Sequence, residues 1–397
     1  MRKITPSLLI LVALVALCGS AISVFARQPA PGQPFNEMVH RNARVYLQVQ
    51  KWNAHSFRNG GGLTATQLRR AYGLNKLPNQ GSGITVAVID AFGNPKAQAD
   101  LNKYSATFGL PSAPVRIVYP QGKPATFNQG WALESNLDIQ MVHAMAPKAK
   151  IVLEAAASAT FANIMGAVKD AYTHRHASII SMSFGGSEFP QETSAGADGI
   201  LAAASKAGVT FTVSSGDHGA GAQYPASSPF VTAVGGTSLH LSKNGAYLNE
   251  TAWSGSGGGM SAFEKRPAYQ NGFNRGTGRA VPDVAMAANP NIGIVVYDSF
   301  GYNGQSGFFS VGGTSASAPM FAGVLAASKQ LSQSIANANS ELYRLARTRY
   351  RADFHDIIVG SNGKCGPECQ ARPGYDFVTG LGSPIANTLV PDIAAIS

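Results

Sequence analysis

The sequence predicts an α/β fold, in which helices cover both faces of a doubly wound, mainly parallel sheet. Two observations lead to this prediction: short apolar runs rich in β-branched residues recur along the 397-residue chain, and helix-like runs separate them. Such alternation is typical of parallel strands joined by helical crossovers that pack on both faces of the sheet. Without the N-terminal leader described below, about 370 residues remain, which fits one large domain although domain size alone would allow two.

The individual elements follow from the same patterns. Five runs carry the strand pattern, at residues 84–91, 150–156, 177–184, 209–214 and 294–297. The two clearest helices are predicted at 162–174 and 197–207. Gly208 ends the second of these helices, because glycine readily takes the left-handed conformation that closes a helix.

The run 131–147 is a further predicted helix, and it carries two carboxylates on one face. Its buried stripe is formed at helical spacing by Leu133, Leu137, Met141 and Ala144. Glu134 and Asp138 are four residues apart and share the adjoining face. His143 lies nine residues after Glu134, about two and a half turns on, so it points to the opposite side. The helix therefore offers a carboxylate pair to a site on that face.

Ser315 is a candidate nucleophile, because it lies where a glycine-rich stretch gives way to a helix, in Gly312-Gly-Thr-Ser-Ala-Ser-Ala-Pro319. Glycines let the backbone approach a substrate, and the start of a helix supplies unpaired N–H groups for an oxyanion. A glycine-rich turn capped by threonine or serine is the alternative interpretation. A serine hydroxyl also needs a neighbouring base to take its proton.

Asp217 lies in Val213-Ser-Ser-Gly-Asp-His-Gly219, directly after the apolar run 209–213. This position is the loop at the carboxyl end of a parallel strand, where active-site groups gather in open α/β sheets. A plain turn, in which Asp217 bonds its own backbone, is the alternative. His218 is a second candidate base.

These three segments together resemble the sedolisin, or serine-carboxyl peptidase, family, which has the subtilisin fold but uses glutamate in place of the catalytic histidine. The resemblance runs from about Leu63 to the C-terminus, and six more segments match, at 63–73, 84–91, 181–186, 257–261, 281–285 and 379–384. By position, it implies that Ser315 is the nucleophile, Glu134 the base, Asp138 its partner carboxylate and Asp217 the acid that stabilises the oxyanion.

The resemblance implies a serine-type endopeptidase that cleaves protein or peptide substrates through an acyl-enzyme on Ser315. The peptide would lie beside residues 183–186 as an added strand, and the Ser315 N–H would complete the oxyanion hole. Glu134 must be ionised and Asp217 protonated, so we expect activity to peak in acid. Glu134 and Asp138 should share a proton and titrate as a unit.

Two alternative functions remain open from the sequence. Asp90 ends a hydrophobic strand where subtilisins keep their triad aspartate, but no His-Gly-Thr-His string accompanies it, so we expect Asp90 to be structural. The other alternative is a peptide-binding scaffold that has the fold but no longer turns over substrate. The presence of all four proposed catalytic residues, Ser315, Glu134, Asp138 and Asp217, argues against such a scaffold.

The resemblance also implies one calcium ion near the C-terminus. In the family, the matching positions bind calcium through the carboxylates of Asp356 and Asp376 and the carbonyl oxygens of Ile357, Arg372 and Gly374. Arg372 stands where the family pattern usually has glycine. A carbonyl ligand tolerates this change, but it brings a positive side chain near the site.

The first 26 residues predict a secretory signal peptide, with Arg2 and Lys3 before the apolar stretch 8–17 and cleavage after Ala26. The stretch is too short for a comfortable membrane span, so a secreted protein is expected, with the periplasm as the other possibility. Lipidation of Cys18 is disfavoured, because Leu17 precedes it where a small residue is expected.

The two remaining cysteines, Cys365 and Cys369, are expected to form a disulfide outside the cell. A zinc site that also uses His355 is the alternative, but it lacks a clear fourth ligand.

Residues 27–62 form a short extension before the predicted peptidase domain at 63–397. Most sedolisins carry a separate folded pro-domain that blocks the active site, and this extension is too short to be one. It could contain one helix at 37–51. The net charge of +10 comes from 31 Lys and Arg against 21 Asp and Glu spread along the chain, which does not indicate nucleic-acid binding. We expect a monomer.

Overall fold

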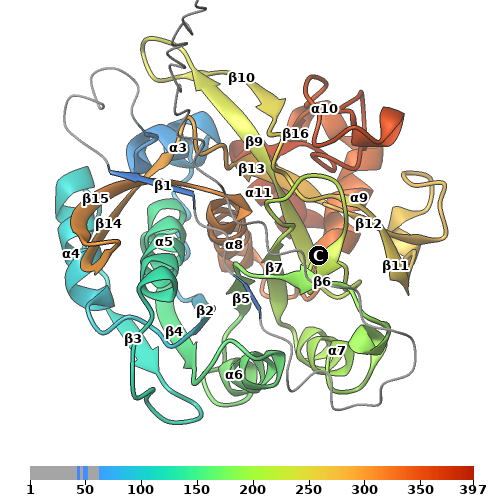
Figure 1. The fold of residues 1–397 in the computed structure, drawn as a ribbon. Coiled ribbons are helices and arrows are strands. Elements are labelled where there is room, and N and C mark those ends of the chain that lie inside the picture. Colours follow the sequence, from blue (N-terminus) through green and yellow to red (C-terminus); the bar gives the residue numbers. More distant parts are fainter. Residues whose placement is uncertain (1–42, 45–47, 52–61) are drawn as a thin grey trace, which may run out of the picture. The chain divides into compact units, whose positions relative to one another are not determined.

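A computed structural model describes residues 43–44, 48–51 and 62–397 of the chain (Figure 1). The predicted signal peptide at 1–26 and most of the predicted extension at 27–62 lie outside these residues. Within the described part of the chain, no helix is long and apolar enough to cross a membrane.

An eight-stranded sheet organises the fold, in the order β10-β9-β7-β5-β2-β4-β3, with β13 also beside β9. Its strands are β2 (Thr85–Ala91), β3 (Val115–Val118), β4 (Lys150–Ala156), β5 (Ile179–Met182), β7 (Thr210–Ser214), β9 (Thr232–Leu241), β10 (Tyr247–Ala252) and β13 (Val284–Ala287). All neighbouring strands pair in parallel except β10 with β9. The predicted mainly parallel sheet is therefore confirmed, and four of the five predicted strands belong to it.

Helices cover both faces of this sheet, as the side chains of β2 show. Val86 and Val88 belong to one hydrophobic core, whereas Ala87 and Ile89 belong to a second core on the other face. The first core includes side chains of α3 (Ala65–Ala71), α4 (Ala97–Phe108), α5 (Gln129–Met145), α8 (Thr314–Leu331), α9 (Ala338–Thr348) and α11 (Ala386–Ile396), and the second those of α6 (Phe161–Thr173) and α7 (Asp198–Lys206). The bounds of α6 and α7 agree to within one residue at each end with the two clearest predicted helices, 162–174 and 197–207.

The fifth predicted strand, 294–297, forms, but in another sheet. It begins β14 (Ile294–Tyr302), which pairs antiparallel with β15 (Gln305–Gly312). Asn303 and Gly304 both have positive φ, so they form a two-residue turn that brings the two strands side by side as a hairpin. An Asn-Gly pair is a strong hairpin signal, and it was readable in the sequence.

The predicted helix at 37–51 is wrong for its last four residues, because they form a strand. Residues Gln48–Lys51 form strand β1, which pairs antiparallel with β15, Gln48 facing Gly312 and Lys51 facing Phe309. The free edge of β15 offers backbone hydrogen-bonding groups that a helix could not use. Residues 37–42 and 45–47 of this prediction lie outside the described residues.

The smaller elements connect these parts. They are β6 (Gly186–Ser187), β8 (Gln223–Tyr224), β11 (Gly259–Lys265), β12 (Gly278–Val281), α10 (Tyr350–Asp353), β16 (Phe354–His355) and β17 (Ser383–Pro384). Cys365 and Cys369 form a disulfide with their Cα atoms 5.4 Å apart, as predicted. The alternative zinc site is wrong, because both sulfur atoms are used in this bond.

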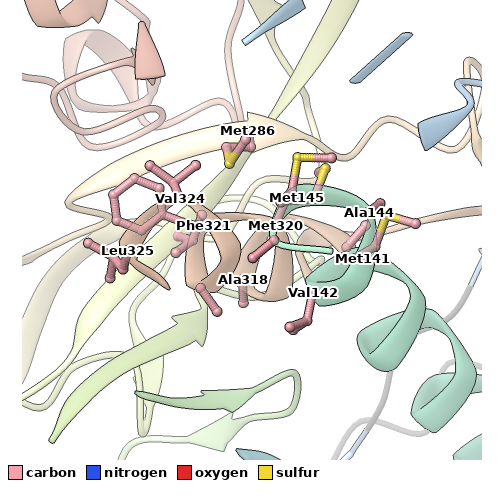
Figure 2. Close-up of a cluster of buried hydrophobic side chains, with 14 of the residues drawn as sticks. Met141, Val142, Ala144, Met145, Met286, Ala318, Met320, Phe321, Val324 and Leu325 are labelled. Atoms are coloured by element: carbon pink, nitrogen blue, oxygen red, sulfur yellow. The ribbon is translucent and has the colours of Figure 1, made fainter. Parts of the chain in front are cut away.

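Helix α5 is buried all the way round. It begins after Asn128, whose side chain accepts the N–H of Trp131 at 3.1 Å, and every residue from Trp131 to Met145 is buried. On one side, Gln140 exchanges two hydrogen bonds with the backbone of Tyr297 in β14. On the other, α5 packs against α8, with Met141, Met145, Met320 and Phe321 among the buried side chains drawn in Figure 2. The predicted apolar stripe was therefore only part of the buried surface.

The close approach of α5 and α8 depends on Gly323. A Cβ atom at this position would lie 2.3 Å from the Cβ of Met145. Protein interiors do not tolerate such overlap, so only glycine allows the two helices to pack at this distance.

We predict that Gly323→Ala destabilises the protein. Alanine favours a helix over glycine by about 1 kcal/mol, but separating two packed helices costs about 1–3 kcal/mol, so the free energy of unfolding in urea should fall. Gly199→Ala in α7 is the matched control, because its new Cβ would be no closer than 3.4 Å to any neighbour. Equal stability of the two variants would contradict the role of Gly323.

Candidate active site

Ser315 lies at the start of α8, beside the carboxyl end of β5. Its side chain is 3% exposed, and Gly313, with a φ of 130°, precedes the helix. The Ser315 hydroxyl donates to the Ser183 carbonyl oxygen at 3.1 Å, and the Ser183 hydroxyl donates to the Ser315 carbonyl oxygen at 3.1 Å. Ser183 directly follows β5, so this double contact holds the candidate nucleophile at the end of the parallel sheet.

The structure brings Glu134 to Ser315. Burial raises the pKa of the Glu134 carboxyl well above its usual range, and the nearby charge of Asp90 raises it further. The Ser315 hydroxyl is close enough to lower this pKa, and the charge of Asp217 raises it. Glu134 therefore lies among Ser315 and two other acidic groups.

Asp138 lies one helical turn further along α5 and forms the expected pair with Glu134. Burial raises the pKa of Asp138 well above its usual range, and the charges of Asp90 and Glu134 add to this effect. The Ser183 hydroxyl opposes the shift. Because each carboxyl raises the pKa of the other, the two cannot both be ionised at low cost and must share protons.

Asp90 is a third carboxyl at the same place, to which the sequence analysis assigned a structural role. It is the penultimate residue of β2 and is fully buried, and burial raises its pKa to about 7, while the nearby Ser135 hydroxyl acts in the opposite direction. Its position at the carboxyl end of a central strand was the available sequence signal. The charge of Asp90 acts on both Glu134 and Asp138, so the pair is in fact a group of three.

Within the described chain, no donor contacts the six oxygen atoms of these three carboxyls. The neighbouring hydroxyls of Ser135, Ser183 and Ser315 donate instead to backbone carbonyl oxygens. A buried carboxylate without a donor is costly, and shared protons remove that cost. The three carboxyls are therefore expected to bind shared protons beside Ser315.

Asp217 is fixed next to Ser315 by Thr314. Its Oδ1 atom accepts the Thr314 N–H and the Thr314 hydroxyl, each at 2.7 Å. Its Oδ2 atom is buried and has no hydrogen-bond partner in the described structure. Burial raises the pKa of Asp217 to about 6, against the two hydrogen bonds from Thr314. A protonated Asp217 would have one oxygen available to donate.

The two histidines considered from sequence do not share this environment. His143 is buried, and its Nε2 atom lies 2.9 Å from the carbonyl oxygen of Pro111, on the far side of α5 as predicted. His218 is an exposed residue, and partial burial and the charge of Arg44 lower its pKa. By contrast, the Ser315 hydroxyl directly lowers the pKa of Glu134.

The segment after Ser183 pairs with a short piece of extended chain from the N-terminal side. Gly185 forms an antiparallel bridge with Arg44, whose N–H donates to the Gly185 carbonyl oxygen at 3.1 Å and whose carbonyl oxygen accepts the Gly185 N–H at 3.4 Å. The Ala43 N–H donates to the carbonyl oxygen of Ala159, in the loop after β4, at 2.7 Å. A piece of extended chain thus already lies where the substrate strand was predicted.

The predicted calcium ligands are close to one another. The hydroxyl of Tyr350 donates to Asp356 at 3.0 Å, and the charges of both Asp356 and Asp376 raise its pKa. Gly374 N–H contacts both oxygens of Asp356, and Arg372 N–H donates to Asp376 at 3.0 Å. In the described residues, no group of three His, Cys, Asp or Glu side chains is arranged for a metal. An ion here would need backbone oxygens.

Such oxygens are present. Within the described chain, the carbonyl oxygens of Ile357, Arg372 and Gly374 accept no hydrogen bond. Two carboxylates and three free carbonyls make a set of hard oxygen donors of the kind that calcium prefers. The residues therefore fit the ion that the resemblance implies.

Comparison with known proteins places the chain in a family. A model of the subtilase family matches residues 125–357, which is more than half of the chain. Kumamolisin from Bacillus sp. (strain MN-32) is 35% identical in an alignment of 345 positions that covers 78% of this chain and 60% of that protein. The chain belongs to the subtilase family, in its sedolisin branch. Sedolisin from Pseudomonas sp. (strain 101) is 28% identical over 81% of this chain and 60% of that protein.

A solved structure of Pseudomonas sedolisin, a serine-carboxyl proteinase complexed with two molecules of pseudo-iodotyrostatin, shares the fold of this chain. The two superpose with a TM-score of 0.75 and 29% identity, covering 84% of this chain and 98% of the solved chain. This chain spans about 60% of the length of the two curated relatives, but nearly all of the solved chain. The predicted subtilisin-like fold is confirmed.

We predict that Thr314→Val raises the pKa of Asp217 above about 6. The Thr314 hydroxyl stabilises the ionised carboxylate, and valine removes this donor while keeping the shape of the side chain. The carboxyl carbon of Asp217 can be followed by NMR during a pH titration. Thr314→Ser is the control, because it keeps the hydroxyl. An unchanged or lower pKa in the valine variant would contradict the arrangement.

Proposed function

We propose that this protein is a secreted serine-carboxyl peptidase, which hydrolyses peptide bonds in acid through an acyl-enzyme on Ser315. One observation carries the proposal: a serine at a helix start lies beside a buried carboxyl group on one side and a fixed, donor-capable Asp217 on the other. The peptidases named among its relatives support the same chemistry.

In the proposed mechanism, the Ser315 hydroxyl turns from the Ser183 carbonyl oxygen to Glu134. Its oxygen attacks the scissile carbonyl carbon, and its proton passes to Glu134. This step takes place in the form of the group in which Asp90 and Asp138 hold the shared protons and Glu134 is ionised. Asp138 and Asp90 keep this proton within the buried group until Glu134 gives it to the leaving amine. Water then attacks the acyl-enzyme, and Glu134 again takes and returns one proton, so the second step restores Ser315.

Protonated Asp217 and the Ser315 N–H stabilise the oxyanion in this proposal. The Oδ1 atom of Asp217 is held by Thr314, which leaves Oδ2 to carry the proton and donate. The N–H of Ser315 donates to no group in the described structure, as expected at the start of a helix. Two donors that are already in place cost no reorganisation during the reaction.

The Gly185 edge binds the substrate backbone, because Arg44 shows that it accepts an antiparallel strand. Substrate and residues 43–44 would then compete for one position. This gives residues 43–44 a role in restraining the peptidase domain at 63–397. An incoming peptide would displace only a few backbone hydrogen bonds, each contributing about 1 kcal/mol.

Calcium is proposed at the C-terminal loops, where Asp356, Ile357, Arg372, Gly374 and Asp376 would hold one ion. Bound calcium supplies positive charge that offsets the two carboxylates and ties the loops together. Burial raises the pKa of Asp376 to about 6, so acid would protonate this ligand and weaken the site. Secretion, from the predicted signal peptide, and a monomeric state complete the proposal.

We predict that the protein cleaves denatured protein at about pH 4 and that Ser315→Ala and Glu134→Gln each lower kcat by at least about 10²-fold. Glutamine keeps the shape of Glu134 but cannot take a proton. Activity should fall as the pH rises through about 6, because Asp217 then loses the proton that it must donate. Thr107→Ala, at an exposed position in α4, is the control.

Cleavage products measured by mass spectrometry distinguish the alternatives. No cleavage by the wild-type protein, with peptide binding intact, would favour the inactive scaffold. A rate that is highest at alkaline pH would contradict the role of Asp217. Equal cleavage by wild type and Ser315→Ala would show that another protease is present and that Ser315 is not the nucleophile.

We predict that removing calcium with a chelator lowers the Tm and that Asp356→Asn abolishes this calcium dependence. Ligand binding to the folded state alone stabilises by about 2.7 kcal/mol at 100 times its Kd, so the shift should be several degrees. Differential scanning calorimetry with added calcium measures it. Asp170→Asn, in α6, is the matched control, because this carboxylate lies away from the loops. Calcium-independent melting of the wild-type protein would rule out the site.

A further inference from the structure

A second cluster of acidic residues lies outside the proposed catalytic site. We call it the lateral carboxyl cluster; its members are Glu188, Glu192, Asp198 and Glu264. Three of them are almost fully buried, with exposures of 0% for Glu192, 5% for Asp198 and 6% for Glu264. Glu264 belongs to β11, whereas the other three lie between β6 and the first turn of α7. The cluster thus joins two segments that are far apart in sequence.

Ordinary hydrogen bonds hold the first two members. Glu188 accepts the hydroxyl of Ser261 and, at 3.1 Å, the N–H of Ala262, both in β11. Glu192 accepts the N–H of Phe189 at 2.8 Å and the hydroxyl of Ser227 at 3.1 Å. These two carboxyls are therefore well supplied with donors.

Asp198 and Glu264 have a different arrangement, because these two buried carboxyls lie close enough to shift each other's pKa. Two ionised carboxylates are both acceptors, so such a contact requires a proton on one of them. Each also has an oxygen without a donor in the described structure, Oδ1 of Asp198 and Oε1 of Glu264. This part of the contact between the segments, unlike the bonds to Glu188, therefore depends on a bound proton.

The surroundings provide little positive charge to replace this proton. Arg279 acts on both Asp198 and Glu264, but its guanidinium is already paired with Asp283 at 2.6 Å, and both side chains are fully buried. The other neighbours are the hydroxyls of Tyr224, Ser227 and Ser228, which are neutral. The charges of Glu188 and Glu192 add repulsion.

We propose that the lateral carboxyl cluster is a pH-operated latch, which tightens the contact of β11 with residues 188–198 through shared protons and loosens it when they are lost, although Glu188 still accepts its two bonds from β11. The latch is separate from the carboxyls around Ser315. Glu188 directly follows β6, which continues the Gly185 strand edge, so release would loosen the side of the cleft that binds the substrate backbone. This last consequence rests on the proposed function, whereas the latch itself does not.

The pKa shifts set the direction of the effect. Burial, the main cause in each case, raises the pKa of Glu192 to about 9, that of Glu264 to about 8 and that of Asp198 to about 6. In the unfolded chain these carboxyls titrate near 4, so the folded state holds more protons between the two ranges. The stabilisation is complete below about pH 4 and is lost as the pH rises through about 6 to 9.

Hydrogen exchange of the Ser315→Ala protein tests the latch without any need for catalysis. After correction for the intrinsic effect of pH, amides of residues 188–198 and 259–265 should exchange at least about tenfold faster at pH 8 than at pH 5. Glu264→Gln, which donates to Asp198 without needing a shared proton, should abolish this difference. Glu368→Gln, at an exposed position, is the matched control and should behave like the parent.

The possible outcomes separate the two proposals. The latch is wrong if the amides of both segments exchange at equal rates at the two pH values. It is also wrong if Glu264→Gln shows the same increase in exchange rate at pH 8 as the parent. Should Glu264→Gln fail to fold, Asp198→Asn tests the same shared proton from the other side. In the chain with Ser315 intact, Glu264→Gln should lower KM at pH 7 and leave kcat unchanged. An inactive chain that still shows the exchange difference would refute the peptidase proposal and support the latch.

Discussion

The site depends on the complete burial of α5. An amphipathic helix would leave its polar face in water, where Glu134 and Asp138 would be two ordinary ionised carboxylates. Here β14 lies on one side of the helix and α8 on the other, with Gly323 allowing the two helices to approach closely. Removal of water raises the pKa of both carboxyls and makes them respond to Asp90 and to each other. The raised pKa values of Glu134 and Asp138 therefore result from the packing around α5 and not from their residue types alone.

The fold gathers these groups through its strand topology. Asp90 ends β2, Ser183 follows β5, and Asp217 lies in the loop after β7, so three neighbouring strands of a parallel sheet each present one group at the same edge. Helix α8 starts at this edge and brings Ser315 with its free N–H. The short hydrogen bonds from Thr314 to Asp217 then set the distance between nucleophile and acid. Few of these contacts are local in sequence.

In the described chain, buried carboxyl oxygens without donors lie around Ser315 and also at Asp198 and Glu264, between β11 and residues 188–198. Within the described residues, no cation contributes to the pKa shifts of Asp90, Glu134 and Asp138, and Arg279 beside the second group is already paired with Asp283, so protons stabilise the folded arrangement in both places. Such a protein gains stability as the pH falls, which is the reverse of one whose carboxylates are paired with lysine or arginine. The acid activity that we propose and the stability of the cleft would therefore depend on pH in the same direction, through different residues.

The sequence by itself determined the fold class, the boundaries of α6 and α7 to within a residue, the disulfide and the family, because periodicity, caps and motifs are local or position-specific signals. It also identified the glutamate and aspartate of α5 by their spacing. It placed 294–297 in the wrong sheet and expected a helix at 48–51, because edge pairing with β15 is a long-range contact. Only the tertiary structure showed that Asp90 joins the pair and that Asp198 and Glu264 are buried with an unpartnered oxygen each, since burial and the absence of donors depend on which distant segments surround a side chain.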